Sequence, residues 1–474
     1  MLFNSLEFAI FLAVVWTLYW IVPASRLRAQ NLLVLAASYL FYGWWDWRFL
    51  ALIAISSAAD FSVGKALGYA TRPAHRRFLL LTSLVVNLGL LGFFKYFNFF
   101  ADSLAAALAP LGIELGHVSL NIVLPVGISF YTFQTLSYTI DVYRRRLAPT
   151  KDAVAFFAFV SFFPQLVAGP IERAANLLPQ FERPRSFDDV AAGHGLRLIL
   201  WGLFKKIVVA DNCGILVDTA FASPATFNSA ELWVAAFLFA VQIYGDFSGY
   251  SDIARGVAAL FGFRLMVNFA MPYFATTIGD FWRRWHISLS TWFRDYLFIP
   301  LGGSRVDAWR AARNVLVTFV VSGLWHGANW TFVVWGFLHG TWYLAEQAWQ
   351  GYRVPAEVRM RRGPNALSTF VAGLTTFTFV LLAWVVFRAA SLEHASDYLV
   401  RMFDMQDMGM PTRGTFALTI AGGFLTVEWL RRHARHVLDL RSWPVSTRWG
   451  AYAGVALWVL AEAGSPRTFI YFQF

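Results

Sequence analysis

A histidine interrupts a long apolar stretch at residues 312–349. His326 lies in the run SGLWHGANW, residues 322–330, between two tryptophans and two glycines. As one helix the stretch would be about 57 Å long, far beyond the ~30 Å apolar core of a membrane, so we expect a broken or closely packed helix. Small residues let a backbone or a ligand approach the imidazole. Two interpretations stay open: a core histidine with satisfied nitrogens, or a residue of a functional site.

A second polar block, YGDFSGYSD at residues 244–252, interrupts another apolar run. It contains the carboxylates of Asp246 and Asp252, the hydroxyl of Ser248, and glycines that we expect to break the helix. Ionisable groups inside apolar runs are costly and are therefore candidates for function. The block predicts either a structural hydrogen-bond hub or the lining of a polar tunnel, and in the second case Asp246, Ser248 and Asp252 are expected to help bind a cofactor.

The segment 264–310 alternates aromatic and charged residues at roughly helical spacing, in the runs FWRRWH and WFRDYL. This composition is typical of short helices at a membrane surface, with rings among the acyl chains and arginines among the headgroups. It predicts either an anchor to membrane lipids or the cytoplasmic wall of a site for an anionic cofactor. In the second case, four arginines would meet phosphates: Arg283, Arg284, Arg294 and Arg305.

The composition indicates which elements must position these residues. Of 474 residues, 58% are hydrophobic and 14% are charged, and the mean hydropathy is +0.52. Because a soluble domain carries about 25% charged residues, we predict an all-α polytopic membrane protein. The net charge is +11, but the basic residues form short clusters between apolar runs, and we expect no nucleic-acid partner.

Apolar runs long enough to enter a membrane recur along the chain. The first is expected to be a membrane-spanning helix rather than a cleavable signal, because it lacks a charged n-region. The run 153–169 contains Pro164, Gly169 and Pro170 and is expected to enter without crossing. We predict one membrane domain, 1–474, with about ten to twelve transmembrane or re-entrant helices. The runs are 2–24, 30–47, 49–69, 78–100, 120–142, 153–169, 195–222, 229–262, 312–349, 366–389, 414–430 and 448–463.

The basic loops indicate how the protein is oriented in the membrane, and the cysteine content limits the kinds of site that it can contain. Even numbers of apolar runs separate the first basic clusters, so these clusters share one face, which the positive-inside rule makes cytoplasmic. We therefore expect a multi-pass protein of the inner membrane with cytoplasmic basic loops. Cys213 is the only cysteine, which excludes a disulfide framework and a thiolate zinc site. No metal is expected, because His286 and His326 are 40 residues apart without an HExxH-type pair.

Several stretches, in order along the chain, closely resemble the membrane-bound O-acyltransferase (MBOAT) superfamily, in its branch of alginate O-acetylation membrane proteins. The resemblance implies a ring of tilted helices around a thin membrane centre pierced by a tunnel. It also implies acyl transfer from a cytoplasmic thioester donor, here acetyl-CoA. The matching stretches are LPVGISFYTFQ (124–134), FPQLVAGPI (163–171), DFSGYSD (246–252), FWRRWHISLS (281–290), FRDYL (293–297), IPLGG (299–303) and GLWHG (323–327).

The resemblance also implies roles for single residues. The histidine of the Trp-His-Gly motif is essential in the family, and here it is His326. Neutral imidazole suits the base that acyl transfer needs near physiological pH, so we expect His326 to be the general base. His286 occupies a second polar position of the family and is expected to partner His326 or to polarise the thioester carbonyl. Asn329 is a candidate for orienting His326.

The chain ends in an aromatic tail at residues 467–474, RTFIYFQF. Such tails usually anchor to the membrane interface. However, a small partner of the related D-alanyl transfer proteins ends in a similar motif whose tyrosine resembles an acyl carrier. We therefore hypothesise that Tyr471 takes the acetyl group and passes it to a periplasmic acetyltransferase, since a phenol is a reasonable leaving group.

The predicted function is movement of acetyl from acetyl-CoA across the membrane for O-acetylation of an exported polysaccharide such as alginate. The same fold would also allow peptidoglycan O-acetylation or D-alanyl transfer to teichoic acid. A secondary transporter is an alternative from another class, and it predicts inverted repeats with broken helices in both halves. We find no matched pair of broken helices in the sequence.

Overall fold

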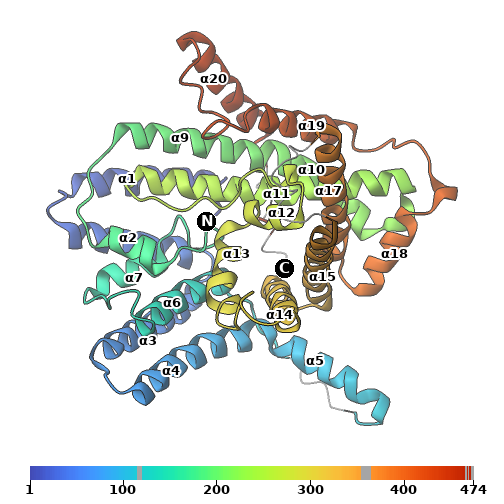
Figure 1. Cartoon of the computed structure of the whole chain (residues 1–474). Helices are drawn as coiled ribbons and strands as arrows, with labels where there is room; N and C mark the ends of the chain where they lie inside the picture. Colours follow the sequence, from blue (N-terminus) through green and yellow to red (C-terminus); the bar gives the residue numbers. More distant parts are fainter. Residues whose placement is uncertain (115–119, 354–364, 465–466, 468, 471–474) are drawn as a thin grey trace. The chain divides into compact units, whose positions relative to one another are not determined.

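A computed structural model describes the chain except for residues 115–119, 354–364, 465–466, 468 and 471–474 (Figure 1). Within the described part, every regular element is a helix. The predicted all-α polytopic membrane fold is confirmed, whereas ten to twelve crossings stays a prediction. Four described helical stretches are long and apolar enough to cross a membrane: Trp47–Tyr69, Pro73–Leu111, Ser229–Leu260 and Ala366–Arg388.

The chain divides into two compact units. The first unit comprises Met1–Ile199 and Tyr250–Met266, and the second comprises Leu200–Gly249 and Val267–Phe474. Organisation as one membrane domain therefore stays a prediction. The candidate residues of the histidine motifs all belong to the second unit.

In the first unit, helix α3 packs against both α4 and α6. These helices share a buried polar cluster, in which Asp60 accepts hydrogen bonds from Ser83, from Asn87 at 2.8 Å and from Thr139 at 2.8 Å. Helix α7 has 9 residues and is only about 14 Å long, too short to cross a membrane. The helices of this unit are α1 (Leu6–Ile21), α2 (Leu27–Gly43), α3 (Leu50–Tyr69), α4 (Pro73–Leu91), α5 (Phe97–Leu108), α6 (Ile128–Tyr143), α7 (Ala153–Ser161) and α8 (Ala174–Phe181).

Two helices contribute to both units, because the unit boundaries fall inside α9 (Asp189–Leu203) and α11 (Ser229–Leu260). A π-helical segment, Phe204–Ala210, directly follows α9. The remaining helices of the second unit are α10 (Asp211–Ala222), α12 (Ile278–Arg284), α13 (Ile287–Phe293), α14 (Ala308–His326), α15 (Trp330–Arg353), α17 (Ala366–Arg388), α18 (Leu392–Met402), α19 (Thr415–Leu430) and α20 (Val445–Glu462).

The apolar stretch 312–349 is broken, as its length predicts. Helix α14 ends at His326 and α15 begins at Trp330, and the two helices pack against each other (Figure 1). Glycines allow their backbones to approach: a Cβ on Gly323 would lie 2.1 Å from the carbonyl oxygen of Phe332. A Cβ on Gly336 would lie 2.3 Å from that of Phe319. The small residues thus place His326 at the end of a tightly packed helix pair.

The polar block 244–252 does not break its helix, so this expectation was wrong. Helix α11 runs without interruption through the block over 32 residues. Its glycines instead admit neighbouring backbone: a Cβ on Gly249 would lie 2.8 Å from the carbonyl oxygen of Gly202, and one on Gly245 would lie 3.1 Å from that of Lys205. Close packing therefore outweighs the intrinsic cost of glycine in a helix, about 1 kcal/mol each.

The segment 264–310 forms short helices, as its composition predicts. Helices α12 and α13 have 7 residues each, and a π-helical turn, Arg294–Phe298, follows them. Helix α12 starts at an N-cap in which the side chain of Thr277 accepts from the backbone N–H of Asp280 at 3.0 Å. Their location at a membrane surface stays a prediction.

Candidate active site

His286 occupies the junction between α12 and α13, outside the four apolar spans. Its φ angle is +42°, in the left-handed region that non-glycine residues seldom adopt. Strained backbone of this kind persists where the surroundings over-determine it, and it concentrates at functional sites. The side chain of His286 is fully buried.

Asn268 fixes the orientation of the His286 ring. Its Oδ1 lies 3.2 Å from His286 Nδ1 and accepts hydrogen bonds from the hydroxyl of Ser288 at 2.8 Å and from the backbone N–H of Ser288 at 3.2 Å. The Ser288 backbone N–H is always a donor, so the atom facing it must be the amide oxygen. His286 Nδ1 therefore carries the proton and donates a hydrogen bond to Asn268 Oδ1.

This hydrogen bond leaves the lone pair of His286 on Nε2. Among the described residues, Nε2 is buried and has no hydrogen-bond partner. Burial lowers the pKa of His286 to about 3, because a charged imidazolium would lose its hydration. His286 is thus a neutral ring that presents a proton acceptor.

His326 faces the same region from the end of α14. Its ring centroid lies 6.3 Å from that of His286, and the side chain is buried. Aromatic rings surround it at centroid distances of 5.1 Å for Trp325, 5.3 Å for Trp335 and 5.5 Å for Phe387. The second unit thereby brings together two imidazoles that are 40 residues apart in sequence, in apolar surroundings where electrostatic interactions are stronger than in water.

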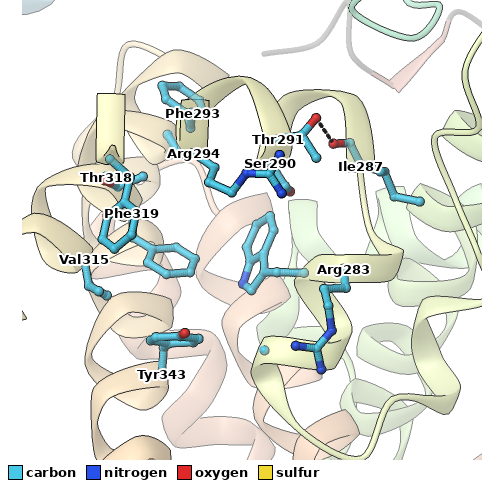
Figure 2. A pocket seen from close by; sticks show the side chains of 14 residues that line it. Arg283, Ile287, Ser290, Thr291, Phe293, Arg294, Val315, Thr318, Phe319 and Tyr343 are labelled. Carbon is cyan, nitrogen blue, oxygen red and sulfur yellow. Dashed lines mark hydrogen bonds between the residues drawn. The ribbon is translucent and has the colours of Figure 1, made fainter. Parts of the chain in front are cut away.

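The second unit also contains a cavity of about 330 Å³, whose lining includes neither of the two histidines (Figure 2). Its wall includes Ile287, which follows His286, and Ser322, which lies one helical turn before His326. Figure 2 shows that Phe319 and Tyr343 supply aromatic surface. The cavity therefore has a largely apolar lining. In the sequence, its wall residues Ile287 and Ser322 lie within four residues of His286 and His326, respectively.

Two of the predicted arginines line this cavity. Arg283 comes from α12 and Arg294 from the π-helical turn, and their side chains are 73% and 58% exposed (Figure 2). The side chains of both arginines thus line the cavity and are also accessible to water. Arg284 pairs with Asp280 at 2.8 Å and is not part of the lining, and neither is the exposed Arg305.

The residues of the polar block lie elsewhere. Asp246 forms an ion pair with Lys206 at 3.0 Å, and Ser248 accepts a hydrogen bond from Lys205 at 2.9 Å. Asp252 belongs to the first unit, where it pairs with Arg255 at 3.0 Å. The structure thus separates the predicted cofactor residues from one another, and only Arg283 and Arg294 line the cavity.

Asn329 caps α15. Its Oδ1 accepts from the backbone N–H of Thr331 at 3.0 Å, and its Nδ2 donates to the carbonyl oxygen of Ala390 at 2.9 Å. These bonds use both ends of the amide, and within the described chain neither goes to His326. Tyr471 lies outside the described residues.

Sequence reasoning missed Asn268 and Lys206. Asn268 stands alone in the run MVNFA, and no spacing to a motif distinguishes it. Lys206 follows Lys205 inside an apolar run, and the pair of adjacent lysines was a usable signal, because ionisable groups in apolar segments seldom lack a partner. Among the described residues, no group of three or more His, Cys, Asp or Glu side chains could hold a metal ion.

Comparison with known proteins identifies the family. The model of the MBOAT, membrane-bound O-acyltransferase family matches residues 144–387, which include Asn268, His286 and His326. The chain is 42% identical to the probable alginate O-acetylase AlgI of Azotobacter vinelandii, over 86% of this chain and 79% of that protein. It is 35% identical to the peptidoglycan O-acetyltransferase of Helicobacter pylori, over 86% of this chain and 81% of that protein.

A more distant relative is the teichoic acid D-alanyltransferase of Bacillus subtilis, which is 27% identical over 59% of this chain and 72% of that protein. The family match sets aside the alternative of a secondary transporter. A buried histidine pair also agrees with the acid–base chemistry of acyl transfer. The chain therefore belongs to the membrane-bound O-acyltransferase family and is a membrane-embedded O-acyltransferase similar to the alginate O-acetylases.

Proposed function

We propose that this enzyme takes acetyl groups from acetyl-CoA and supplies them for the O-acetylation of an exported polysaccharide such as alginate. The observation that carries the proposal is the buried pair of His286 and His326, in the same unit as a cavity whose wall includes Ile287 and Ser322. The similarity to alginate O-acetylases supports both the acetyl group and the polysaccharide context.

The cavity suits the donor. Coenzyme A combines phosphates with a slender thiol arm, and the cavity combines exposed arginines with an apolar lining. Arg283 and Arg294 would bind the phosphates, since guanidinium groups form strong charge-assisted hydrogen bonds with them. The thioester would then extend along Trp282 and Phe319 towards the histidines.

The reaction needs a base and a route for one proton. An acceptor hydroxyl attacks the thioester carbonyl carbon while His326 takes its proton. A C–O bond forms, the C–S bond breaks, and the leaving thiolate takes the proton from the histidinium. The aromatic rings around His326 exclude water and so protect the thioester from hydrolysis.

His286 acts as the proton-accepting partner of His326 in this proposal. Because Nδ1 donates to Asn268, neutral His286 presents a lone pair at Nε2. A lone pair cannot donate a hydrogen bond to a carbonyl oxygen, so this geometry favours partnership with His326 over polarisation of the thioester.

We also propose that the acetyl group leaves through the aromatic tail. Tyr471 would accept it as a tyrosyl ester and pass it to a periplasmic acetyltransferase. The protein would lie in the inner membrane with its basic loops cytoplasmic, so the cavity with Arg283 and Arg294 would meet the cytoplasmic pool of acetyl-CoA.

The test uses purified full-length protein and acetyl-CoA labelled in the acetyl group. Mass spectrometry then locates the label on the chain or on a co-purified partner. His326→Ala should abolish transfer and leave expression and folding intact. His75→Ala is the matched control, because His75 is exposed in the first unit.

Two outcomes would contradict the proposal. If His326→Ala transfers acetyl as fast as the parent protein, His326 is not the base. If Tyr471→Phe leaves polymer acetylation in cells unchanged, the tyrosyl ester is not an intermediate, and the acetyl group reaches the periplasm by another acceptor.

A further inference from the structure

A buried ionic cluster in the second unit has no part in the proposed acyl transfer. Lys206, in the π-helical segment, lies 2.8 Å from a carboxylate oxygen of Asp211 and 3.0 Å from one of Asp246. The side chains of Lys206 and Asp246 are 8% and 3% exposed. One ammonium thus faces two carboxylates, which leaves the cluster short of positive charge.

The C-terminal tail supplies what the cluster lacks. The backbone N–H of Ile470 donates to Asp246 Oδ2 at 2.7 Å, whereas the 3.0 Å contact of Lys206 is with Oδ1. Arg467 lies 3.5 Å from Asp218 on α10, and its charge also acts on Asp211. Charge complementarity therefore favours the tail as the occupant of this site.

Aromatic rings connect the C-terminal tail with His286 through Phe247. Phe469 and Ile470 are 2% and 1% exposed, as buried as core residues. The ring of Phe469 lies 5.9 Å from that of Phe247, the neighbour of Asp246 on α11. Phe247 in turn lies 4.6 Å from the ring of His286. One phenyl ring thus separates the tail from the active site.

The helices leave space for the tail. Gly214 on α10 lies next to Gln242 on α11, and a Cβ on Gly214 would lie 2.8 Å from the Gln242 side-chain nitrogen and 3.3 Å from the Arg467 guanidinium. Gln242 and Asp246 are four residues apart and share one face of α11. A larger residue at position 214 would displace the tail from this face.

We infer that Asp246 and Lys206 form a receptor site for the described residues of the chain's own C-terminal segment, Arg467, Phe469 and Ile470, and hold Phe469 one ring away from His286. They are positioning residues: Lys206 forms an ion pair with Asp246, and Asp246 fixes the backbone of Ile470. The functional part of this inference rests on the proposed role of Tyr471.

The closing experiment digests the full-length protein in detergent with carboxypeptidase A, which removes aromatic and aliphatic residues and stops at arginine. Intact-mass measurement follows the loss of Ile470 and Phe469. In the parent protein these two residues should resist digestion. In Asp246→Asn they should be lost about tenfold faster or more, because a hydrogen bond to a charged group contributes about 1.5–3 kcal/mol.

Two further variants keep the result interpretable. Phe469→Ala loosens the tail without changing α11, so it should also speed digestion even if Asp246→Asn folds poorly. Glu231→Gln changes a buried carboxylate on the same helix that bonds to Thr412 instead of the tail, and its digestion should match the parent. Coenzyme A binding, measured by calorimetry, should be unchanged in all three variants.

The outcomes separate this inference from the proposed function. Parent-like protection of Ile470 in Asp246→Asn would overturn the receptor site and leave acetyl transfer by His326 untouched. Faster digestion together with intact coenzyme A binding and a loss of label on Tyr471 is the expected result. Faster digestion with lost coenzyme A binding would show general unfolding and would also overturn the positioning role.

Discussion

The hydrogen bond between Asn268 and His286 gives the sharpest test of the site. Asn268→Asp keeps an acceptor oxygen in the same place but adds a negative charge next to Nδ1. An opposite charge favours the protonated imidazole, so the pKa of His286 should rise from its low value of about 3.

The size of the effect follows from the geometry. Two unit charges 3.2 Å apart interact by roughly 5 kcal/mol at an effective dielectric constant of about 20. The cost of burying the new carboxylate offsets part of this energy, so we expect the pKa of His286 to rise by about 1–3. His286 would then gain a proton between about pH 4 and pH 6, where the parent ring is neutral.

The assay is release of coenzyme A thiol from acetyl-CoA between pH 4.5 and 8. Protonated His286 cannot accept a proton, so Asn268→Asp should lose activity as the pH falls, at a higher pH than the parent protein does. Asn268→Leu removes the acceptor and frees the ring, so it should lose activity at every pH. Circular dichroism across the same range controls for unfolding. Superimposable profiles for Asn268→Asp and the parent would refute the assigned tautomer and the proton-accepting role of His286.

Three other substitutions follow from the packing and the cavity. Gly323→Ala places a Cβ 2.1 Å from the Phe332 carbonyl oxygen, so it should separate α14 from α15, lower the thermal unfolding temperature and abolish activity; a parent-like melting curve would contradict this packing. Arg283→Gln with Arg294→Gln should raise KM for acetyl-CoA about tenfold and leave kcat nearly unchanged, and an unchanged KM would remove both arginines from donor binding. Asn329→Ala removes a helix cap and should cost about 1 kcal/mol of stability with activity retained, whereas inactive but stable protein would restore Asn329 as a catalytic group.

Much of the site was predictable from local pattern. The length of the run 312–349 predicted that the helix is broken, and the small residues around His326 indicated where. The structure confirms a break between His326 and Trp330. The arginines of the FWRRWH and WFRDYL runs were assigned to a cofactor wall, and two of them line the cavity. These features depend on residues close together in sequence, where periodicity and composition carry the information.

The polar block shows where such reasoning fails. Glycines in the run 244–252 were expected to break α11, because glycine is a poor helix former in isolation. In the folded chain, the backbone around Gly202 and Lys205 packs closely against Gly249 and Gly245, and this packing keeps α11 intact. The carboxylate of Asp246 was assigned to a cofactor, whereas it binds Lys206 and the tail.

By itself the sequence determined the membrane class and the helical architecture, because hydropathy is a local property, and its short motifs made His286 and His326 candidates for the site. Only the tertiary structure decided that Asn268 orients His286, that the two imidazoles lie close together, and that Asp246 accepts a hydrogen bond from Ile470. Each of these depends on side chains brought together from distant parts of the chain. Hydrogen bonds and ion pairs act over about 3 Å, so which groups they join is set by folding and not by spacing along the chain.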